Sequence, residues 1–234
     1  MKPFRFKQFD VQQSSEVFRV GTDAVLLGIL SNVHQAKEIL EVGTGTGIIA
    51  LMLAQRNPEA KILAIDINTE AVKISQNNFS QSVFSPRLKS RLQDFKQSDT
   101  KEQFDLILSN PPYFEVSSSE KDILARQRLE LDFSDLIQKA SELLSAEGLF
   151  SVIIPIESEK QFTQLCNESL LFLQRKVIIK GIETAEPKRV VLEYCFRKSE
   201  AIIENFVIEK SPRVYSDEYL ELTKDFHVFN KKAL

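Results

Sequence analysis

The chain has 234 residues, of which 43% are hydrophobic and 27% charged, and its net charge is −3 at pH 7. This balance predicts a globular protein with a substantial core, and it excludes a disordered chain or a wholesale polycation. Two cysteines in apolar stretches predict buried thiols, and two isolated histidines give no ligand set, so we expect no metal. No signal peptide or long apolar run is present, which predicts a cytoplasmic protein.

Apolar runs and helical patterns alternate along the first two thirds of the chain. In chain order they predict a strand at 38–42, a helix at 48–56, a strand at 61–65, a helix at 69–79, strands at 88–92 and 104–108, a helix at 133–144, a strand at 148–154 and a helix at 158–170. Such alternation predicts right-handed βαβ crossovers and a parallel sheet covered by helices on both faces.

Three further extended stretches, at 171–179, 190–197 and 202–209, have no helical pattern between them and predict an antiparallel hairpin. We therefore expect an α/β fold that is doubly wound and Rossmann-like, with a mostly parallel seven-stranded sheet and an antiparallel C-terminal hairpin. This is the layout of methyltransferases that use S-adenosylmethionine (SAM). The chain reads as one domain, with an arm and helix at 1–35 before a catalytic core at 36–234.

The first nine residues form a basic and aromatic arm. Three cations alternate with three phenylalanines, namely Lys2, Arg5 and Lys7 with Phe4, Phe6 and Phe9. A solvated arm whose phenylalanines pack on the core is the interpretation that this pattern alone favours. A nucleic-acid contact is the alternative, because binding depends on a local basic patch and not on net charge.

A glycine-rich loop lies between the first predicted strand and the first core helix. It carries Gly43, Gly45 and Gly47, which permit a tight turn and the close approach of a ligand at the carboxyl edge of the sheet. The spacing is G-x-G-x-G rather than the dinucleotide G-x-G-x-x-G, and Glu41 stands two residues before the first glycine, as in SAM enzymes. NAD remains the rival ligand, because one fold serves many functions.

Acidic residues end the next two strands. Asp66, followed by Ile67, lies about 20 residues beyond the loop, where an acid can accept hydrogen bonds from a ribose diol. Asp94, followed by Phe95, is a candidate acceptor for an adenine amine. Either acid could also be an ordinary turn residue. Together with the glycine loop, they favour SAM.

The fourth strand runs into Asn110-Pro111-Pro112-Tyr113, followed by Phe114. Two prolines hold this loop stiff. The Asn110 side-chain oxygen and the Pro111 carbonyl could accept hydrogen bonds from an exocyclic or amide nitrogen, whose lone pair is otherwise delocalised, and Tyr113 could stack on its planar group. A rigid turn is the alternative, and the position at a fourth strand favours catalysis. The motif specifies a nitrogen and leaves the substrate open.

With these motifs in place, the chain resembles the bacterial methyltransferases that act on N6 of adenine-37 of a valine tRNA. The resemblance covers nearly the whole chain, and its most specific parts lie outside the glycine loop. They are the arm 4–9, the segment Val20-Gly21-Thr22-Asp23 with Leu26-Leu27-Gly28, the loop 110–113, Ala125-Arg126 with Leu131, Pro187-Lys188-Arg189-Val190, and Tyr215-Ser216 with Tyr219, Leu222 and Thr223.

The resemblance implies that SAM is the cofactor, S-adenosylhomocysteine the product, and a tRNA anticodon loop the partner, with no metal, membrane or obligate protein partner. It implies that Thr22 and Asp23 contact the cofactor from the side opposite the glycine loop. It also implies substrate contacts from five residues, namely Lys7, Phe114, Arg126, Lys188 and Arg189.

Three alternatives stay open. A protein-glutamine N5-methyltransferase shares the Asn-Pro-Pro-Tyr loop, but it usually has a separate N-terminal helical domain, for which the roughly 35 residues before the first strand are too few. Another RNA or DNA amino-methyltransferase is the second alternative. The third is a catalytically silent RNA-binding module, against which an intact glycine loop and an intact catalytic loop both argue.

Overall fold

The computed structural model describes residues 1–17, 20–111 and 132–227. Its strands are β1 (Phe4–Arg5), β2 (Asp10–Val11), β3 (Glu38–Val42), β4 (Lys61–Asp66), β5 (Leu88–Leu92), β6 (Phe104–Ser109), β7 (Leu144–Pro155), β8 (Phe172–Ile182), β9 (Arg189–Cys195), β10 (Ile202–Ser211) and β11 (Val214–Tyr215). Its helices are α1 (Thr22–Leu30), α2 (Ile48–Arg56), α3 (Thr69–Ser80), α5 (Phe133–Leu143), α6 (Glu159–Glu168) and α7 (Asp217–Thr223), with short 3-10 turns η1 (Ser85–Arg87), η2 (Phe95–Gln97) and η3 (Ile156–Ser158).

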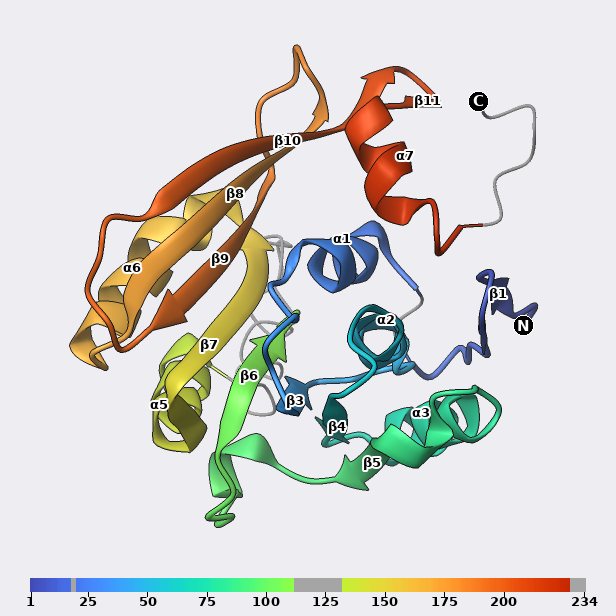
Figure 1. Cartoon of the computed structure of the whole chain (residues 1–234), viewed down its shortest axis with the longest axis horizontal. Helices are drawn as coiled ribbons and strands as arrows, with labels where there is room; N and C mark the ends of the chain where they lie inside the picture. The colour runs from blue at the N-terminus through green and yellow to red at the C-terminus, as the bar shows by residue number, and fades with distance from the viewer. Residues whose placement is uncertain (18–19, 112–131, 228–234) are drawn as a thin grey trace, which may run out of the picture.

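One large mixed sheet organises the described part of the molecule (Figure 1). Its strand order is β11-β10-β8-β9-β7-β6-β3-β4-β5. The strands β5, β4, β3, β6 and β7 are parallel, and β9 is antiparallel to both β7 and β8. The predicted α/β fold, the parallel core and the antiparallel hairpin are therefore confirmed.

The edge of the sheet differs from the expectation. Residues 202–209 lie in β10, which pairs parallel with β8, and β11 extends the sheet further. The described sheet thus has nine strands rather than seven. The reason is that β9 already has a neighbour on each side. A chain that reverses after β9 runs in the direction of β8, and β10 pairs on the free edge of β8.

Helices cover both faces of the sheet, as predicted (Figure 1). One core cluster packs α1, α2 and α7 on one face, and the other packs α5 and α6 on the opposite face. Every residue from Ile48 to Ala54 is buried, so α2 lies in the middle of its layer. The Asp132 carboxylate accepts from the Ser134 N–H and caps α5. Helix α7 was not predicted, because a seven-residue helix shows too little periodicity.

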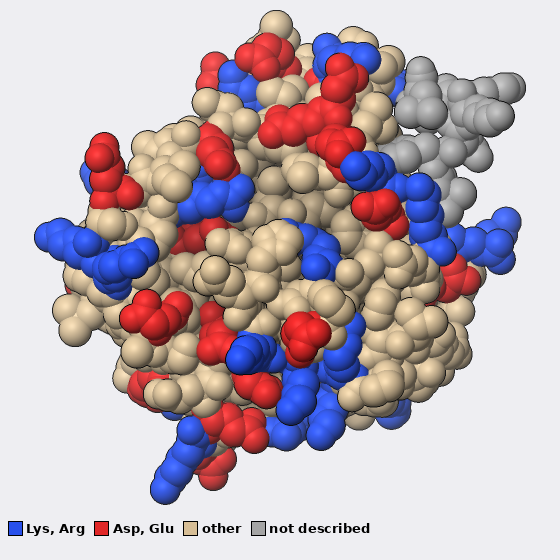
Figure 2. Space-filling model, in the orientation of Figure 1, with Lys and Arg blue, Asp and Glu red and all other residues tan. Residues whose placement is uncertain are grey.

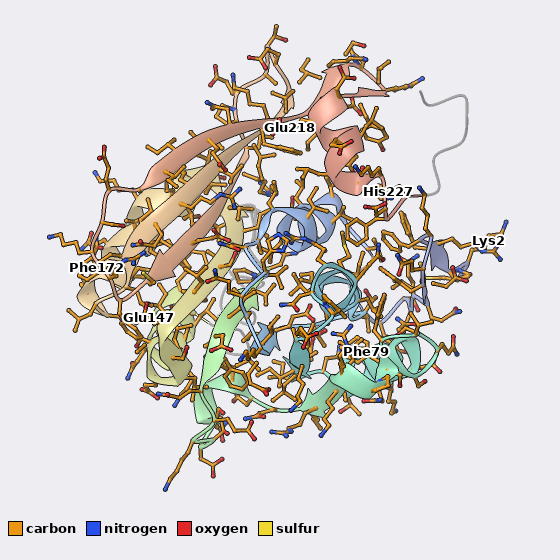
Figure 3. All side chains as sticks on the ribbon, viewed as in Figure 1. Lys2, Phe79, Glu147, Phe172, Glu218 and His227 are labelled. Carbon is orange, nitrogen blue, oxygen red and sulfur yellow. The ribbon has the colours of Figure 1, made fainter. Side chains whose placement is uncertain are left out.

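The N-terminal arm packs against the C-terminal part of the chain. Phe6 and Phe9 are only 5% and 6% exposed, which confirms that these rings pack on the core, while Phe4 is partly exposed. The Phe6 ring stacks on the His227 ring with centroids 5.6 Å apart, and a backbone bridge joins the same two residues. Figure 3 shows His227 between the end of α7 and the arm that carries Lys2. Both cysteines are buried, as expected.

None of the helices in the described ranges has the length and apolar character needed to cross a membrane.

Candidate active site

Four parallel strands end at the same edge of the sheet, and their register brings the predicted site residues together. Val42 at the end of β3 pairs with Ile65 of β4 on one side and with Ser109 of β6 on the other. The next residue along each strand is therefore Gly43, Asp66 or Asn110, at one level on adjacent strands. Neighbouring strands lie about 4.8 Å apart, so a single small ligand can reach all three.

The glycine loop has the backbone conformation that glycine permits. Gly43, Gly45 and Gly47 have φ of 75°, 54° and 81°. A Cβ at Gly43 would have no atom within 4 Å, so open space lies beside this backbone. A Cβ at Gly47 would lie 2.5 Å from the Phe79 ring, so that glycine is required by packing as well. Figure 3 labels Phe79 on α3, beside α2. The loop thus leaves room for a ligand at its start and packs tightly at its end.

Asp66 is tied to the glycine loop. Its carboxylate accepts from the Gly45 N–H and from the Asn68 N–H, each at 2.9 Å. A carboxylate has about four acceptor positions, so Asp66 can hold the loop and still receive a ligand hydroxyl. The Ile67 side chain beside it is 57% exposed and offers an apolar surface at the same edge.

Glu41 is a fully buried carboxyl group under the glycine loop. Its Oε2 accepts from the Thr44 hydroxyl at 2.8 Å and from the Ala50 N–H at 3.1 Å. Its Oε1 is buried and has no hydrogen-bond partner. Burial raises the pKa of Glu41 from 4.5 to about 8, more than its two hydrogen bonds lower it. A cationic ligand group beside the loop would stabilise the ionised form of this carboxyl group.

The raised pKa of Glu41 predicts a specific pH dependence of stability. The folded protein keeps this proton up to about pH 8, whereas the unfolded chain releases it near 4.5, so rising pH lowers the free energy of unfolding between these values. Glu41→Gln cannot ionise and should remove this contribution. The melting temperature of the ligand-free protein should therefore fall less steeply with rising pH in the variant than in the wild type. Equal slopes in the two proteins would show that Glu41 is ionised when folded.

Asp94 and Phe95 lie in the turn that follows β5. The Asp94 carboxylate caps η2, accepting from the Lys96 N–H at 3.0 Å and from the Gln97 side-chain amide at 2.8 Å. Asp94 thus acts as a turn residue, which was the alternative to ligand binding. The carboxylate still has acceptor positions for a ligand. Phe95 is buried in the core. Its ring therefore packs in the core and anchors the turn that carries Asp94.

The start of the Asn-Pro-Pro-Tyr loop is fixed to the strand that precedes the glycine loop. The Ser109 hydroxyl donates to the Val42 carbonyl at 2.9 Å and ties the ends of β6 and β3 together. Asn110 is half-buried and Pro111 is buried. Four of the predicted residues, Pro112, Tyr113, Phe114 and Arg126, lie outside the described residues. The structure therefore places the asparagine of the motif beside Gly43 and leaves the stacking residues as predictions.

Comparisons with known proteins agree with this geometry. Residues 12–175 match the family described as the methyltransferase small domain. A protein of Flavobacteriaceae bacterium (strain 3519-10), named tRNA1(Val) (adenine(37)-N6)-methyltransferase, is 54% identical over 98% of this chain and 100% of its own length. The chain belongs to this methyltransferase family. The sequence resemblance and the expectation of an enzyme are thereby confirmed.

Solved structures confirm the fold of this methyltransferase. A predicted O-methyltransferase, Atu636 of Agrobacterium tumefaciens, superposes with a TM-score of 0.67 at 17% identity, over 87% of this chain and 96% of the other. An O-methyltransferase of a Brevibacillus brevis trans-AT PKS multienzyme was solved in complex with S-adenosyl-L-homocysteine. It superposes with a TM-score of 0.50 at 16% identity, over 66% of this chain and 54% of the other.

Two residues of the methyltransferase that were expected on different ligands contact each other. Asp23, in the first turn of α1, accepts from the Arg189 guanidinium at 3.0 Å, and both side chains are about three-quarters buried. Arg189 begins β9 and also donates to the Lys188 carbonyl. The exposed Thr22 begins the same helix. The pair therefore links the N-terminus of α1 to the sheet edge next to β7.

The remaining predicted substrate residue lies away from these strand ends. The Lys7 ammonium donates to the carbonyl of Lys224, just after α7, and the Lys7 N–H donates to the Phe226 carbonyl at 2.8 Å. This placement anchors the arm, and RNA contact by Lys7 stays a prediction. Among the residues that the structure describes, no group of His, Cys, Asp and Glu side chains could hold a metal ion.

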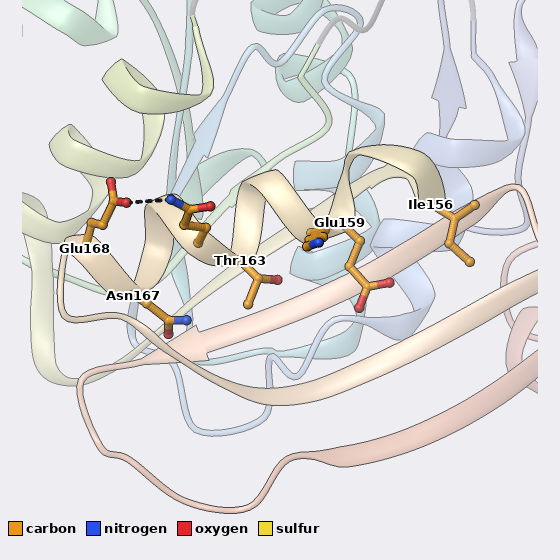
Figure 4. A pocket seen from close by; sticks show the side chains of 7 residues that line it. Ile156, Glu159, Thr163, Asn167 and Glu168 are labelled. Carbon is orange, nitrogen blue, oxygen red and sulfur yellow. Dashed lines mark hydrogen bonds between the residues drawn. The ribbon is translucent and has the colours of Figure 1, made fainter.

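A cavity of about 730 Å³ lies elsewhere, along α6 (Figure 4). Its lining residues are Ile156, Glu159, Lys160, Thr163, Gln164, Asn167 and Glu168. Two of these are engaged in the fold, because Thr163 bonds Tyr194 and Glu159 pairs with Lys176. None of the strand-end residues lines this cavity, so it is distinct from the candidate active site.

Proposed function

We propose that this methyltransferase transfers a methyl group from SAM to N6 of adenine-37 in the anticodon loop of tRNA1(Val), in the cytoplasm, as a single domain without an obligate protein partner. The observation that carries the proposal is the register that sets Gly43 beside Asn110, with Asp66 on the next strand. The name of the 54% identical relative supports the substrate.

SAM fits the residues present at the strand ends. The open backbone at Gly43 leaves room for its amino-acid end, and the cationic ammonium group there would favour the ionised form of the buried Glu41 carboxyl group. The Asp66 carboxylate would accept from the ribose hydroxyls, and Asp94 from the adenine amine. Thr22 and Asp23 would approach from α1. SAM supplies an electrophilic methyl group, which removes the need for a strong base.

Asn110 and Pro111 supply the positioning that the nitrogen needs. The N6 lone pair of adenine is delocalised into the ring, so the amino group must pyramidalise before it attacks. Hydrogen bonds from its two N–H groups to the Asn110 side-chain oxygen and the Pro111 carbonyl favour that geometry. Because donor and acceptor are held in line, orientation supplies most of the rate enhancement. Stacking of the base on Tyr113 and Phe114 completes the proposed pocket.

Basic side chains near the N-terminus would contact the RNA backbone. Figure 2 shows Lys and Arg side chains along the side of the molecule where Figure 3 labels Lys2. Acidic and basic groups are mixed over much of this face, and a further group of Lys and Arg side chains lies at its lower centre. Attraction to phosphate is therefore local. We assign phosphate contacts to Lys7 of the arm and, away from the N-terminus in the sequence, to Lys188 and Arg126. Binding that relies on these contacts should weaken as salt rises.

We expect the Asp23–Arg189 ion pair to hold the N-terminus of α1 over the cofactor. Asp23→Ala or Arg189→Ala should weaken SAM binding by about two- to fivefold, the size expected for a partly exposed pair. Exchanging the charges in Asp23→Arg with Arg189→Asp should recover much of that loss in calorimetry. Additive losses in the double variant would instead show that each side chain acts on a ligand separately.

A cellular test of the proposed function uses deletion of the gene. Nucleoside mass mapping of tRNA1(Val) should find N6-methyladenosine at position 37 in the parent strain and unmodified adenosine in the deletion strain. Complementation with the wild-type gene should restore the modification, and complementation with Asn110→Ala should not. An unchanged position 37 in the deletion strain would refute the proposed substrate.

A further inference from the structure

Residues 12–17, which follow the N-terminal arm, lie beside the glycine loop. A Cβ at Gly45 would lie 3.8 Å from Cγ1 of Val17, which is itself buried. Asn68, the N-cap of α3, donates from its side chain to the Glu16 carbonyl at 3.4 Å. The backbone of this segment therefore lies close to both the loop and the residues that follow Asp66.

One buried amide joins that segment to the loop. Asn78 of α3 is fully buried. Its Oδ1 accepts from the Gln12 N–H at 2.9 Å, and its Nδ2 donates to the Gln12 carbonyl at 3.1 Å and to the Thr46 carbonyl at 2.8 Å. Both amide hydrogens and the oxygen are used. The side chain thus holds both backbone groups of Gln12 and a carbonyl within the glycine loop.

The other end of the arm is fixed just as firmly. Gln12 directly follows β2, where Val11 is fully buried. The Phe6 and Phe9 rings stack with centroids 4.7 Å apart, and Phe6 continues onto His227. The His227 ring stacks in turn on Tyr219 of α7 at 6.1 Å. A continuous series of contacts therefore runs from the basic arm to the glycine loop, and Asn78 is the link into that loop.

We propose that Asn78 is a positioning residue that couples the N-terminal arm to the cofactor loop, so that RNA held on the arm tightens cofactor binding. The identities of the two ligands rest on the proposed function. The physical basis is that the Thr46 carbonyl and both backbone groups of Gln12 share one amide. Displacing the Thr46 carbonyl leaves a buried polar group unpaired, which is costly, and displacing Gln12 breaks two part-buried hydrogen bonds to the same amide. By linkage, the cofactor tightens RNA binding by the same factor.

The test measures SAM affinity by calorimetry with and without tRNA. In the wild type, saturating tRNA should lower the dissociation constant of SAM. Asn78→Ala should weaken SAM binding by about tenfold, as expected for loss of buried hydrogen bonds, and should abolish the effect of tRNA. Asn77→Ala is the matched control, because Asn77 is the exposed neighbour on the same helix and, within the described residues, its side chain bonds Gln81 alone. It should leave both quantities unchanged.

A merely structural role would lower the melting temperature of Asn78→Ala but leave the tRNA-induced change in SAM affinity intact, and that result would overturn the proposal. Should Asn78→Ala fail to fold, hydrogen exchange of the wild type decides. SAM should slow amide exchange in residues 4–11, which lie before the segment beside the loop. Unchanged exchange there would also overturn it. A protein that binds SAM and shows this protection, yet leaves tRNA1(Val) unmethylated, would refute the proposed substrate and retain the coupling.

Discussion

Asn110→Ala should lower kcat by about a hundredfold or more, the size seen when one preorganised hydrogen-bond partner of a transition state is lost. The hydrogen bond to N6 strengthens as positive charge develops on the nitrogen, so it stabilises the transition state more than the ground state. The Ser109–Val42 hydrogen bond fixes the strand end and keeps this asparagine in place. A single-turnover assay with saturating tRNA and SAM measures the chemical step directly.

The controls separate chemistry from binding. Asn110→Ala should change SAM affinity little, and Gln103→Ala, an exposed position just before the same strand, should leave the rate unchanged. Tyr113→Phe should be mild and Tyr113→Ala should weaken RNA engagement, because only the second removes the stacking ring. Methyl transfer by Asn110→Ala at the wild-type rate would mean that the loop is only a rigid turn.

Asp66→Ala should weaken SAM binding at least tenfold. The carboxylate holds the Gly45 N–H and would also accept from the ribose, so the variant loses both the loop contact and the ligand contact. Removing a charged acceptor of this kind costs on the order of 1.5–3 kcal/mol. Asp99→Ala, at an exposed acid, is the matched control in calorimetry and should bind SAM normally. Unaltered affinity in Asp66→Ala would reject Asp66 as the ribose acceptor.

Local sequence signals predicted the parts of the fold that depend on local physics. Helix α2 has the bounds expected, because the glycine loop and an apolar run ending at Arg56 define it. The strand ends at Val42 and Asp66 follow from buried apolar runs that end in turn residues. Residues 202–209 were expected in the closing antiparallel hairpin but pair parallel as β10, because the choice of strand partner depends on which edges are already occupied.

Contacts between distant parts of the chain could not be predicted in the same way. Nothing near Phe6 indicates that its ring meets His227, and the link from Asn78 to Gln12 depends on a tertiary arrangement. The ion pair between Asp23 and Arg189 was not predicted, because Asp23 was expected to contact the cofactor and Arg189 the substrate.

Methylation of a purified tRNA1(Val) transcript by the purified protein and SAM, with the product mapped by mass spectrometry, tests the proposed function most directly. We expect one methyl group per transcript, on N6 of adenine-37, and none on a transcript with guanine at that position. Equal methylation of both transcripts, or SAM binding without any transfer to the wild-type transcript, would contradict the proposed function.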